Sequence, residues 1–391
     1  MRTVIITLPY FFKGEGREIT RMLTSGKAWR LHLRKPDATE SQMRTLIEAI
    51  PPALYGRLSI HDHFRLAKEY GLGGVHLNSR NNTVPEGWQG IVSRSVHTIE
   101  ETENTDADYA FFSPVFPSIS KPGYMPRLSI DRLAGKVSSR IFALGGVTPD
   151  KYGLIESAGF GGAAMLGAAW RPNIDTQHFR MQLITNRTDR HTISEGAEMA
   201  LEGGCRWIQL RMKDASDTDI IAEGLRLRQL CRKYHATFII DDHVELVDEL
   251  EADGVHLGKN DMPVAAARKI LGPMKIIGST ANTYEDIRNA CAEGADYIGL
   301  GPFRFTQTKK NLSPILGIEG YRDITALRSR DGIVIPVVAI GGITDADIPD
   351  IMHTGVEGIA LSSSILSAQD PRLQTAATLK SINTSIWKQT D

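Results

Sequence analysis

Short apolar runs and longer amphipathic segments alternate along the whole chain. In the second half the apolar runs predict strands, because they are four to six residues long and rich in Ile, Val and Leu. They are MQLIT (181–185), WIQLR (207–211), TFIID (237–241), GVHL (254–257), KIIG (275–278), YIGLG (297–301), PVVAIG (336–341) and GIAL (358–361). Between them, stretches such as IIAEGLRLRQLCRKY (220–234) and YEDIRNACAEGA (284–295) place apolar residues at helical spacing. Eight strands that each precede a helix predict a (β/α)8 barrel.

The first half shows the same pattern, from VIIT (4–7) to AAML (163–166), and repeats the sequence of the second half. LHLRKPD (31–37) corresponds to IQLRMKD (208–214), and IHDHFRLAKEYGLGGVHL (60–77) to IDDHVELVDELEADGVHL (240–257). YAFFSPVFPSISK (109–121) corresponds to YIGLGPFRFTQTK (297–309), and IFALGGVTPD (141–150) to VVAIGGITDA (337–346). The repeat is as long as a domain. We therefore predict a duplicated α/β domain: two tandem TIM (β/α)8 barrels of the phosphate-binding type.

The two barrels are expected to meet at a linker of residues that interrupt regular structure. WRPNIDTQH (170–178) combines Pro, Asn and Asp. A chain of 391 residues is also longer than one hydrophobic core usually serves. We therefore expect domains over residues 1–177 and 178–391.

Composition excludes several classes of function. Apolar residues make up 41% and charged residues 23%, and the net charge is -1, so no global charge attracts a nucleic acid or an anionic membrane. Cys205, Cys231 and Cys291 are odd in number and widely spaced, which favours buried apolar side chains over disulfides or a zinc site. The N-terminal stretch has neither the length of a membrane span nor the form of a secretion signal. Cytoplasmic residence is the expected default.

The first candidate for chemistry is the polar series in IQLRMK. Gln209, Arg211 and Lys213 alternate, so on a strand they share one face and point into the barrel. A solvated edge is the alternative explanation, but a strand of a closed barrel has no such edge. Because two buried, unpaired cations are very costly, the series predicts an anionic ligand. Arginine offers a bidentate fork to phosphate, lysine a point charge and glutamine a neutral donor.

Two acids follow neighbouring strands. Asp242 ends FIIDD, and Asp261 lies just beyond GVHLG. They could share one Mg2+ that bridges to a pyrophosphate, since Mg2+ typically takes one or two carboxylates plus substrate phosphates. Each Asp alone is also typical of a helix N-cap, and Pro263 favours that alternative for Asp261. Their joint occurrence favours the metal.

The remaining candidates lie in loops after later strands. Thr306, Thr308 and Lys309 belong to a polar loop, GPFRFTQTKKN, which could equally be exposed to solvent. AIGGIT (339–344) and GIALSSSI (358–365) follow the seventh and eighth strands, where such barrels bind phosphate on backbone amides. Gly341 and Gly342 permit close approach of the backbone. A cationic site with Mg2+ beside an amide-lined site suggests a diphosphate that reacts with a phosphorylated nucleophile.

One combination of motifs resembles the thiamine phosphate synthases over essentially the whole second half: QLRMK, FIIDD, ADGVHLGKNDMP, GADYIGLGPF, TQTKK and VVAIGGIT. The resemblance implies a transferase that couples 4-amino-5-hydroxymethyl-2-methylpyrimidine diphosphate with hydroxyethylthiazole phosphate. The implied products are thiamine monophosphate and pyrophosphate, with Mg2+ as cofactor and only small molecules as partners. In the implied dissociative reaction the C–O bond breaks first, and the thiazole nitrogen then attacks the carbocation.

The resemblance also implies roles by position. Diphosphate binding falls to Gln209, Arg211, Lys213 and Lys309, and metal binding to Asp242 and Asp261. Thiazole phosphate binding falls to Thr306, Gly342 and the backbone of Ser362 and Ser363, with Thr308 nearby. The residues expected to act on the reacting groups are Lys309, Thr280 and Arg211.

Two positions depart from the family pattern. Asp241 stands where the family usually has Asn. An ionised carboxylate accepts hydrogen bonds and donates none, so Asp241 would accept from the pyrimidine amino group or extend the metal site. Thr280 stands where Ser is common, which is a mild change that keeps the hydroxyl.

The first barrel keeps only part of this set. His32 replaces Gln209, Pro36 replaces Lys213 and Asn81 replaces Asp261. Arg34, Asp62 and Lys121 remain. With one metal carboxylate and one cation absent, Mg–pyrophosphate chemistry is not expected there. Ser118, Ser120, Gly145, Gly146 and the run 162–168 still suggest a phosphate pocket.

The overall pattern of the first barrel, with RSVHT (94–98), is similar to the TenI-like thiazole tautomerases. Those relatives use a histidine in the loop after the sixth strand, where this chain has Ser113 and Pro114. We expect the first barrel to be either a thiazole tautomerase or a non-catalytic barrel that packs against or regulates its partner.

Two other classes of function stay open for the second barrel. A phosphate-binding barrel isomerase or lyase would need a lysine or an acid–base pair at the barrel centre, and the sequence offers no convincing candidate. A non-catalytic protein that binds thiamine intermediates would not need the two aspartates. A homo-oligomer, or packing of the two barrels within the chain, is possible in each case.

Overall fold

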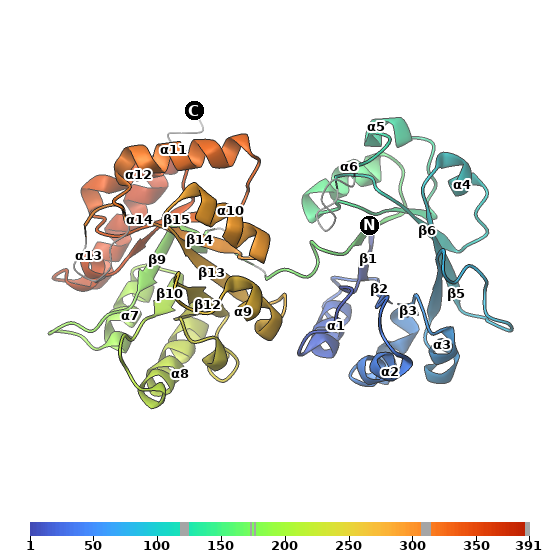
Figure 1. The fold of residues 1–391 in the computed structure, drawn as a ribbon, viewed down its shortest axis with the longest axis horizontal. Coiled ribbons are helices and arrows are strands. Elements are labelled where there is room, and N and C mark those ends of the chain that lie inside the picture. Colours follow the sequence, from blue (N-terminus) through green and yellow to red (C-terminus); the bar gives the residue numbers. More distant parts are fainter. Residues whose placement is uncertain (118–124, 173, 176, 306–313, 388–391) are drawn as a thin grey trace. The chain divides into compact units, whose positions relative to one another are not determined.

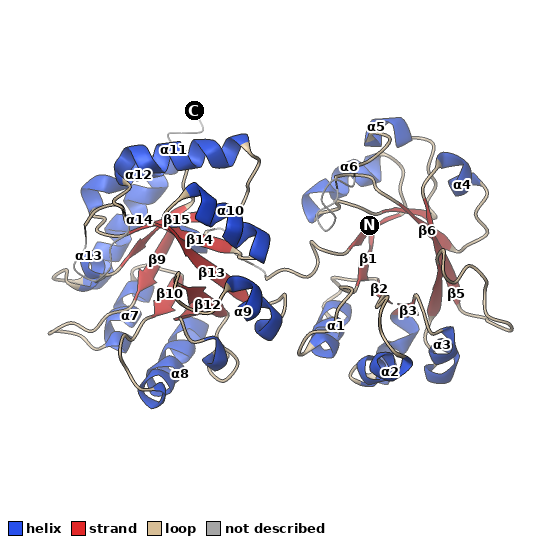
Figure 2. Ribbon diagram, in the orientation of Figure 1, coloured by secondary structure: helices blue, strands red, loops and turns tan. Residues whose placement is uncertain are grey.

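The computed structural model describes residues 1–117, 125–172, 174–175, 177–305 and 314–387. The chain divides into two compact units, Met1–Arg171 and Pro172–Asp391. Each unit contains a closed barrel of eight parallel strands, in which β1 pairs with β8 and β9 pairs with β16. Helices lie outside the strands of each barrel (Figures 1 and 2). The predicted fold class is confirmed, whereas the boundary after residue 177 stays a prediction.

The strands and helices of the first barrel are short. Its strands are β1 (Arg2–Ile6), β2 (Arg30–Leu33), β3 (Leu58–Ile60), β4 (Gly74–Leu77), β5 (Ile91–Val96), β6 (Tyr109–Phe112), β7 (Ile141–Ala143) and β8 (Gly162–Met165). Its helices are α1 (Glu15–Thr24), α2 (Glu40–Glu48), α3 (Phe64–Tyr70), α4 (Ile99–Glu103), α5 (Ile130–Leu133) and α6 (Tyr152–Ser157). Its described residues also form the 3-10 turns η1 (Pro52–Arg57) and η2 (Pro149–Lys151).

The second barrel carries longer helices around the same strand order. Its strands are β9 (Met181–Ile184), β10 (Trp207–Leu210), β11 (Thr237–Asp241), β12 (Gly254–Leu257), β13 (Ile276–Ala281), β14 (Tyr297–Leu300), β15 (Val337–Ile340) and β16 (Gly358–Leu361). Its helices are α7 (Ile193–Glu202), α8 (Asp217–Lys233), α9 (Val264–Leu271), α10 (Tyr284–Glu293), α11 (Gly317–Arg330), α12 (Ile348–Met352), α13 (Ser363–Leu366) and α14 (Pro371–Trp387). Its 3-10 turns are η3 (His178–Arg180), η4 (Val244–Leu246) and η5 (Asp345–Asp347).

The expectation that every strand precedes a helix is wrong after β4, β8 and β11. The described residues that follow β8, 166–172, 174–175 and 177, contain no α-helix. In the first barrel, the described segment 78–90 joins β4 to β5 without a helix. That segment, NSRNNTVPEGWQG, is rich in Asn, Gly and Pro, which favour turns. In the second barrel, η4 and turns take the place of a helix after β11.

Side chains on the strands of the second barrel alternate between its interior and the layer beneath its helices. Ile208 and Leu210 of β10 belong to the outer core, whereas Trp207 packs inside the barrel with Phe179. Gln209 lies two residues after Trp207 and therefore points inward. Polar residues at such inward positions near the strand ends form the candidate site.

The cysteines differ in burial from one another. Cys205 and Cys231 are buried, but Cys291 on α10 is exposed, so the expectation of burial is wrong for Cys291. The buried face of α10 carries Ile287 and Ala290, and the next residue points about 100° away on a helix. Within the described residues, none of the helices has the length and apolar character that crossing a bilayer requires.

Candidate active site

A chain of polar contacts begins where β10 and β11 end in the second barrel. Gln209 is 3% exposed and donates a hydrogen bond from Nε2 to Oδ1 of Asp241, the last residue of β11. The Nε of Arg211 lies 3.2 Å from Oδ2 of the same carboxylate. Asp241 is thus the common acceptor that holds both Gln209 and Arg211 at the barrel rim.

The contacts continue across the buried interior of the barrel. Gln182 on β9 donates hydrogen bonds to Gln209 Oε1 at 3.0 Å and to the Tyr297 hydroxyl at 3.1 Å. The His256 ring on β12 lies 3.0 Å from that hydroxyl through Nδ1 and 3.0 Å from Thr280 Oγ1 through Nε2. Because unpaired buried polar groups are costly, this network fixes the orientation of its members. The contact with His256 therefore fixes the orientation of the Thr280 side chain.

Arg211 and Lys213 do not lie on the strand that the alternation predicts. β10 ends at Leu210, and the backbone turns at Asp214, whose φ is 60°. The Arg211 side chain is 28% exposed and paired with Asp241, and Lys213 is exposed. The argument from two buried, unpaired cations is therefore wrong. Both cations lie in the loop after β10, where a ligand in the barrel mouth would meet them.

Asp242 and Asp261 lie together beside these residues. Asp242 has a φ of 65°, which is uncommon for a residue other than glycine. Asp261 Oδ2 accepts a hydrogen bond from the Gly258 amide at 2.6 Å. The pKa of Asp242 is raised to about 8, mainly by burial. The nearby Asp241 carboxylate and a hydrogen bond with Asp261 raise it further. The carboxyl groups are therefore close enough to disfavour ionisation of both.

This carboxyl pair fits a hard divalent cation. A positive charge between two repelling carboxylates reverses the effect that raises the pKa, and carboxylate oxygen is the side-chain ligand that Mg2+ prefers. The alternative role of the two aspartates as helix N-caps is wrong. The N-cap residue of η4 is His243, and that of α9 is Pro263.

The turn after β15 lies against the loop after β14. Gly341 and Gly342 have φ values of 99° and 69°, and a Cβ on Gly341 would lie 2.8 Å from Pro302 Cβ. Arg304 donates a hydrogen bond to the Gly342 carbonyl at 2.9 Å and pairs with Asp347 at 2.7 Å. Glycine is required here because the two loops touch through their backbones.

The other candidate residues of the phosphate site are placed only in part. Ser362 precedes α13, which begins at Ser363 directly after β16. Since parallel strands end on one side of a barrel, this segment and the turn after β15 face the same mouth. Thr306, Thr308 and Lys309 lie outside the described residues.

In the first barrel, three buried histidines occupy the corresponding interior. His32 Nδ1 lies 2.9 Å from His61 Nε2, and His32 Nε2 lies 2.5 Å from the Tyr109 hydroxyl. His76 contacts the hydroxyls of two serines on β5 at 3.0 and 3.1 Å. Burial lowers the pKa of His32 and His61 far below the usual value and that of His76 to about 3. These imidazoles are therefore neutral at pH 7.

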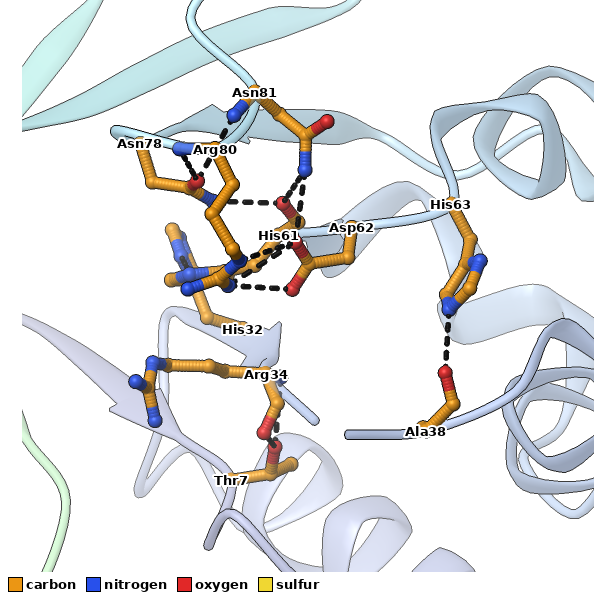
Figure 3. A network of polar contacts seen from close by, with 10 residues as sticks. All are labelled: Thr7, His32, Arg34, Ala38, His61, Asp62, His63, Asn78, Arg80 and Asn81. Atoms are coloured by element: carbon orange, nitrogen blue, oxygen red, sulfur yellow. Dashed lines mark hydrogen bonds and ion pairs between the residues drawn. The ribbon is translucent and has the colours of Figure 1, made fainter. Parts of the chain in front are cut away.

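The first barrel also replaces the carboxyl pair. The Arg80 guanidinium contacts both Asp62 oxygens through Nη2, at 3.1 and 3.0 Å. Asn81 donates a hydrogen bond from Nδ2 to Asp62 Oδ1 at 2.8 Å. Figure 3 shows both side chains directed at the Asp62 carboxylate. A guanidinium is thus paired with the carboxylate where the second barrel has two acids.

The remaining candidates of the first barrel surround a cavity. Gly145 and Gly146 have φ values of 91° and 61° and line it, as do residues 164–168. Ser118, Ser120 and Lys121 lie outside the described residues.

Sequence reasoning missed three buried members of the polar network in the second barrel. They are Gln182, His256 and Tyr297. The available signal was a polar side chain at an inward position of an apolar run, as in MQLIT and GVHL.

A family model described as thiamine monophosphate synthase matches this chain twice, over residues 4–169 and 181–365. The two matches cover both barrels and agree with the internal repeat.

Individual relatives match about half of the chain. The thiamine-phosphate synthase of Phocaeicola vulgatus is 60% identical over 195 residues, which cover 50% of this chain and 94% of that protein. The thiamine-phosphate synthase of Flavobacterium johnsoniae is 52% identical over 196 residues, covering 50% and 92%. A solved structure, thiamine phosphate pyrophosphorylase from Pyrococcus furiosus, is 36% identical, covers 54% of this chain and 98% of that one, and has a TM-score of 0.49.

Proposed function

The chain belongs to the thiamine monophosphate synthase family, and on that premise we propose that its second barrel is the synthase. It couples 4-amino-5-hydroxymethyl-2-methylpyrimidine diphosphate with hydroxyethylthiazole phosphate and gives thiamine monophosphate and pyrophosphate. The observation that supports this barrel is the carboxyl pair of Asp242 and Asp261 beside Arg211. In the first barrel the counterpart of Asp261 is Asn81.

The diphosphate binds at the rim between β10 and β11. Gln209 donates from the strand, and Arg211 and Lys213 supply charge from the following loop. Asp241 contacts Arg211 through Nε, and a guanidinium carries two further amino groups for phosphate oxygens. Lys309 adds charge from the loop after β14. Asp241 thus positions the arginine.

Asp242 and Asp261 are the residues that would hold Mg2+. An ion held there would supply positive charge toward the departing pyrophosphate. Fixed cations at the rim act in the same sense, because charge stabilisation that is already in place needs no rearrangement during the reaction.

The thiazole phosphate binds on the amide-lined side. Its ligands are the Gly342 amide, the backbone of Ser362 and Ser363, and Thr306, with Thr308 assisting. The C–O bond breaks with its electron pair going to pyrophosphate, and the thiazole nitrogen donates its lone pair to form the C–N bond. The protein aligns the two reactants and excludes water. Thr280, whose Oγ1 lies 3.0 Å from His256 Nε2, acts on the reacting groups in this proposal.

The test is turnover of the full chain with both substrates and Mg2+, measured as thiamine monophosphate formed. Arg211→Ala should lose turnover while thiazole phosphate binding is retained. Arg226→Ala removes a 69% exposed arginine on α8 and serves as the matched control. Absence of product from the unaltered chain would exclude the proposal, and equal loss of thiazole phosphate binding would favour a binding protein.

The activity of the first barrel stays a prediction, either a thiazole tautomerase or a non-catalytic partner. His97 lies 2.8 Å from the Ser113 carbonyl and lines the cavity, so a histidine is present near the loop that the tautomerase comparison singles out. Assay of tautomer conversion by the Arg211→Ala chain separates these alternatives, because the synthase is then silent.

A further inference from the structure

A cavity of about 740 Å³ lies at the carboxyl ends of the strands of the first barrel. Its lining includes Arg34, Arg80 and Arg94, and Glu101 is the one acid among the described residues that line it. The Glu101 carboxylate accepts two backbone N–H groups at the start of α4 and is therefore already engaged. The side chains facing this cavity carry a net positive charge, and its volume is in the range of small-molecule sites.

Arg34 lacks the partner that its counterpart has. In the second barrel Arg211 pairs with Asp241, but His61 occupies the corresponding place in the first. Among the described residues, no hydrogen bond or ion pair engages the Arg34 guanidinium, which Figure 3 shows extended without a contact. Burial, followed by the charge of Arg80, lowers the pKa of Arg34. A half-buried guanidinium of this kind is stabilised by an anionic ligand.

Arg80 stands where the second barrel would hold its divalent ion. In the aligned repeats Arg80 corresponds to Asn260, and Asn81 to Asp261. The contacts of Arg80 with Asp62 use Nε and Nη2, and none of these contacts uses Nη1. Here the Asp62 carboxylate is neutralised by the guanidinium of Arg80, a side chain of the protein itself. The carboxylate therefore needs no added cation.

The neighbouring histidines do not form a metal site in this conformation. Ring nitrogens of His32, His61 and His76 lie within 4.8 Å of one another. However, the His61 and His76 rings stack with an angle of 24° between their planes. Lone pairs lie in the ring planes, so those of two nearly parallel rings do not converge on one ion. The positive charges of Arg34 and Arg80 also oppose a cation there.

We propose that the first barrel binds a phosphate or diphosphate group without a metal ion, through Arg34, Arg80 and Arg94. Arg80, fixed by Asp62, supplies the positive charge that a divalent ion would supply in the second barrel. The comparison with that ion rests on the proposed function, but the binding itself does not, because the two sites lie in different barrels.

The test is calorimetric titration of the full chain with inorganic pyrophosphate, and separately with inorganic phosphate, in the presence of EDTA. All titrations use a chain that also carries Arg211→Gln. This change removes an arginine that is proposed to bind pyrophosphate in the second barrel. We expect one pyrophosphate site per chain in this background, and Arg34→Gln should weaken that site about 10- to 100-fold. Arg65→Gln, which alters a 73% exposed arginine on α3, should change Kd less than about twofold. Tighter binding of pyrophosphate than of phosphate would identify a diphosphate ligand, and equal binding a monophosphate.

Pyrophosphate binding that requires Mg2+, or that survives Arg34→Gln, would overturn the proposal. If Arg34→Gln does not fold, as judged by circular dichroism and thermal unfolding, Arg94→Gln replaces it. That side chain is 33% exposed and pairs only at 3.5 Å with Asp106, which is 87% exposed. A loss of about tenfold is expected there.

A second variant tests the role of Arg80 directly. The double change Arg80→Asn with Asn81→Asp recreates the side chains of the second barrel at these positions. Binding of pyrophosphate should then fall at least about tenfold in EDTA and return when Mg2+ is added. Undiminished binding in EDTA would show that Arg80 does not replace an ion. Synthase turnover is measured separately on the unaltered chain, so failure of this inference and failure of the proposed function are distinguishable.

Discussion

The two barrels have the same strand order but opposite charge requirements at their strand ends. In the second barrel, Asp242 and Asp261 form a carboxyl pair that favours an added cation. In the first barrel, Arg80 already neutralises Asp62, and Arg34 has no carboxylate partner among the described residues. A few substitutions on one scaffold thus separate the proposed cation site from the proposed anion site.

The interiors differ in the same systematic way. The second barrel joins Gln182, Tyr297 and His256 in a network of amide, hydroxyl and imidazole groups. The first barrel has His32 and His61 among three stacked or hydrogen-bonded imidazoles. Histidines can be protonated in mild acid, whereas amides and hydroxyls cannot. The difference therefore predicts unequal stability of the barrels.

Acid should produce the largest contrast between the barrels. Burial places the folded-state pKa values of His32, His61 and His76 below the unfolded value of about 6.5. The unfolded state then binds protons first as pH falls. The contribution of these neutral histidines to the free energy of unfolding is fully present above about pH 6.5. It is lost progressively as the pH falls toward about 3, the pKa of His76. Each histidine contributes about 1.4 kcal/mol per pH unit within its window.

Thermal unfolding between pH 7 and pH 4 measures this effect, and hydrogen exchange assigns each transition to a barrel. The transition of residues 1–171 should fall more steeply with acid than that of the second unit. His32→Gln, which introduces the residue of the second barrel, should reduce the slope. Parallel pH profiles for both barrels would contradict the comparison.

The second largest effect is expected at an ion pair that the first barrel alone contains. Lys35 Nζ lies 2.7 Å from Glu15 Oε1, and both side chains are almost fully buried. Met212 occupies the corresponding position in the second barrel. Burial raises the pKa of Glu15, and Lys35 opposes that rise. Lys35→Met removes this opposition and should destabilise the first barrel by about 3–5 kcal/mol.

Denaturant unfolding followed by hydrogen exchange tests this prediction. The double variant Glu15→Gln with Lys35→Met should recover part of the loss, because no unpaired charge remains buried. Lys136→Met at an exposed position is the control. A Lys35→Met chain as stable as this control would show that the pair contributes little.

Removal of a carboxylate should affect turnover in the second barrel. Asp242→Asn is expected to lower kcat by about 10²- to 10³-fold, because charge stabilisation of the leaving group is lost. Thiamine monophosphate formation at saturating substrates measures the effect. Asp323→Asn, at an exposed position on α11, is the control. A kcat within about threefold of the control would place the catalytic charge elsewhere.

The smallest predicted effect concerns the buried hydroxyl that both barrels share. Tyr297→Phe leaves Gln182 and His256 each without one partner, and should cost the second barrel about 1–3 kcal/mol. Tyr109→Phe removes the contact with His32 in the first barrel and provides the comparison. Thermal unfolding of both variants is the measurement. Each substitution should lower the unfolding transition of its own barrel. A shift in the unfolding transition of the other barrel would show that the two interiors are not independent.

The strands could be predicted almost completely, but the ends of strands could not. WIQLR suggested a strand through Arg211, whereas β10 ends at Leu210 and the chain turns at Asp214. Alternation therefore placed Gln209 correctly relative to the barrel interior and misplaced Lys213. A strand ends where its neighbours stop pairing with it, and that depends on the register of adjacent strands.

The candidate site was predictable as a set of residue types and not as a set of contacts. The aspartates and cations after β10, β11 and β12 were visible as polar residues that follow apolar runs. The contact of Asp241 with Gln209 and Arg211 was not, because the partner comes from a separate strand. The same holds for Arg80 on Asp62 in the first barrel.

By itself the sequence determined that this protein is a duplicated barrel and which residue types reach the mouth of each barrel. Both conclusions depend on local periodicity, which a strand or a helix expresses wherever it packs. Only the tertiary structure decided which charges are paired and which are left for a ligand. That choice depends on distances of a few ångströms between neighbouring strands, at which the energy of a charge is set by its immediate surroundings.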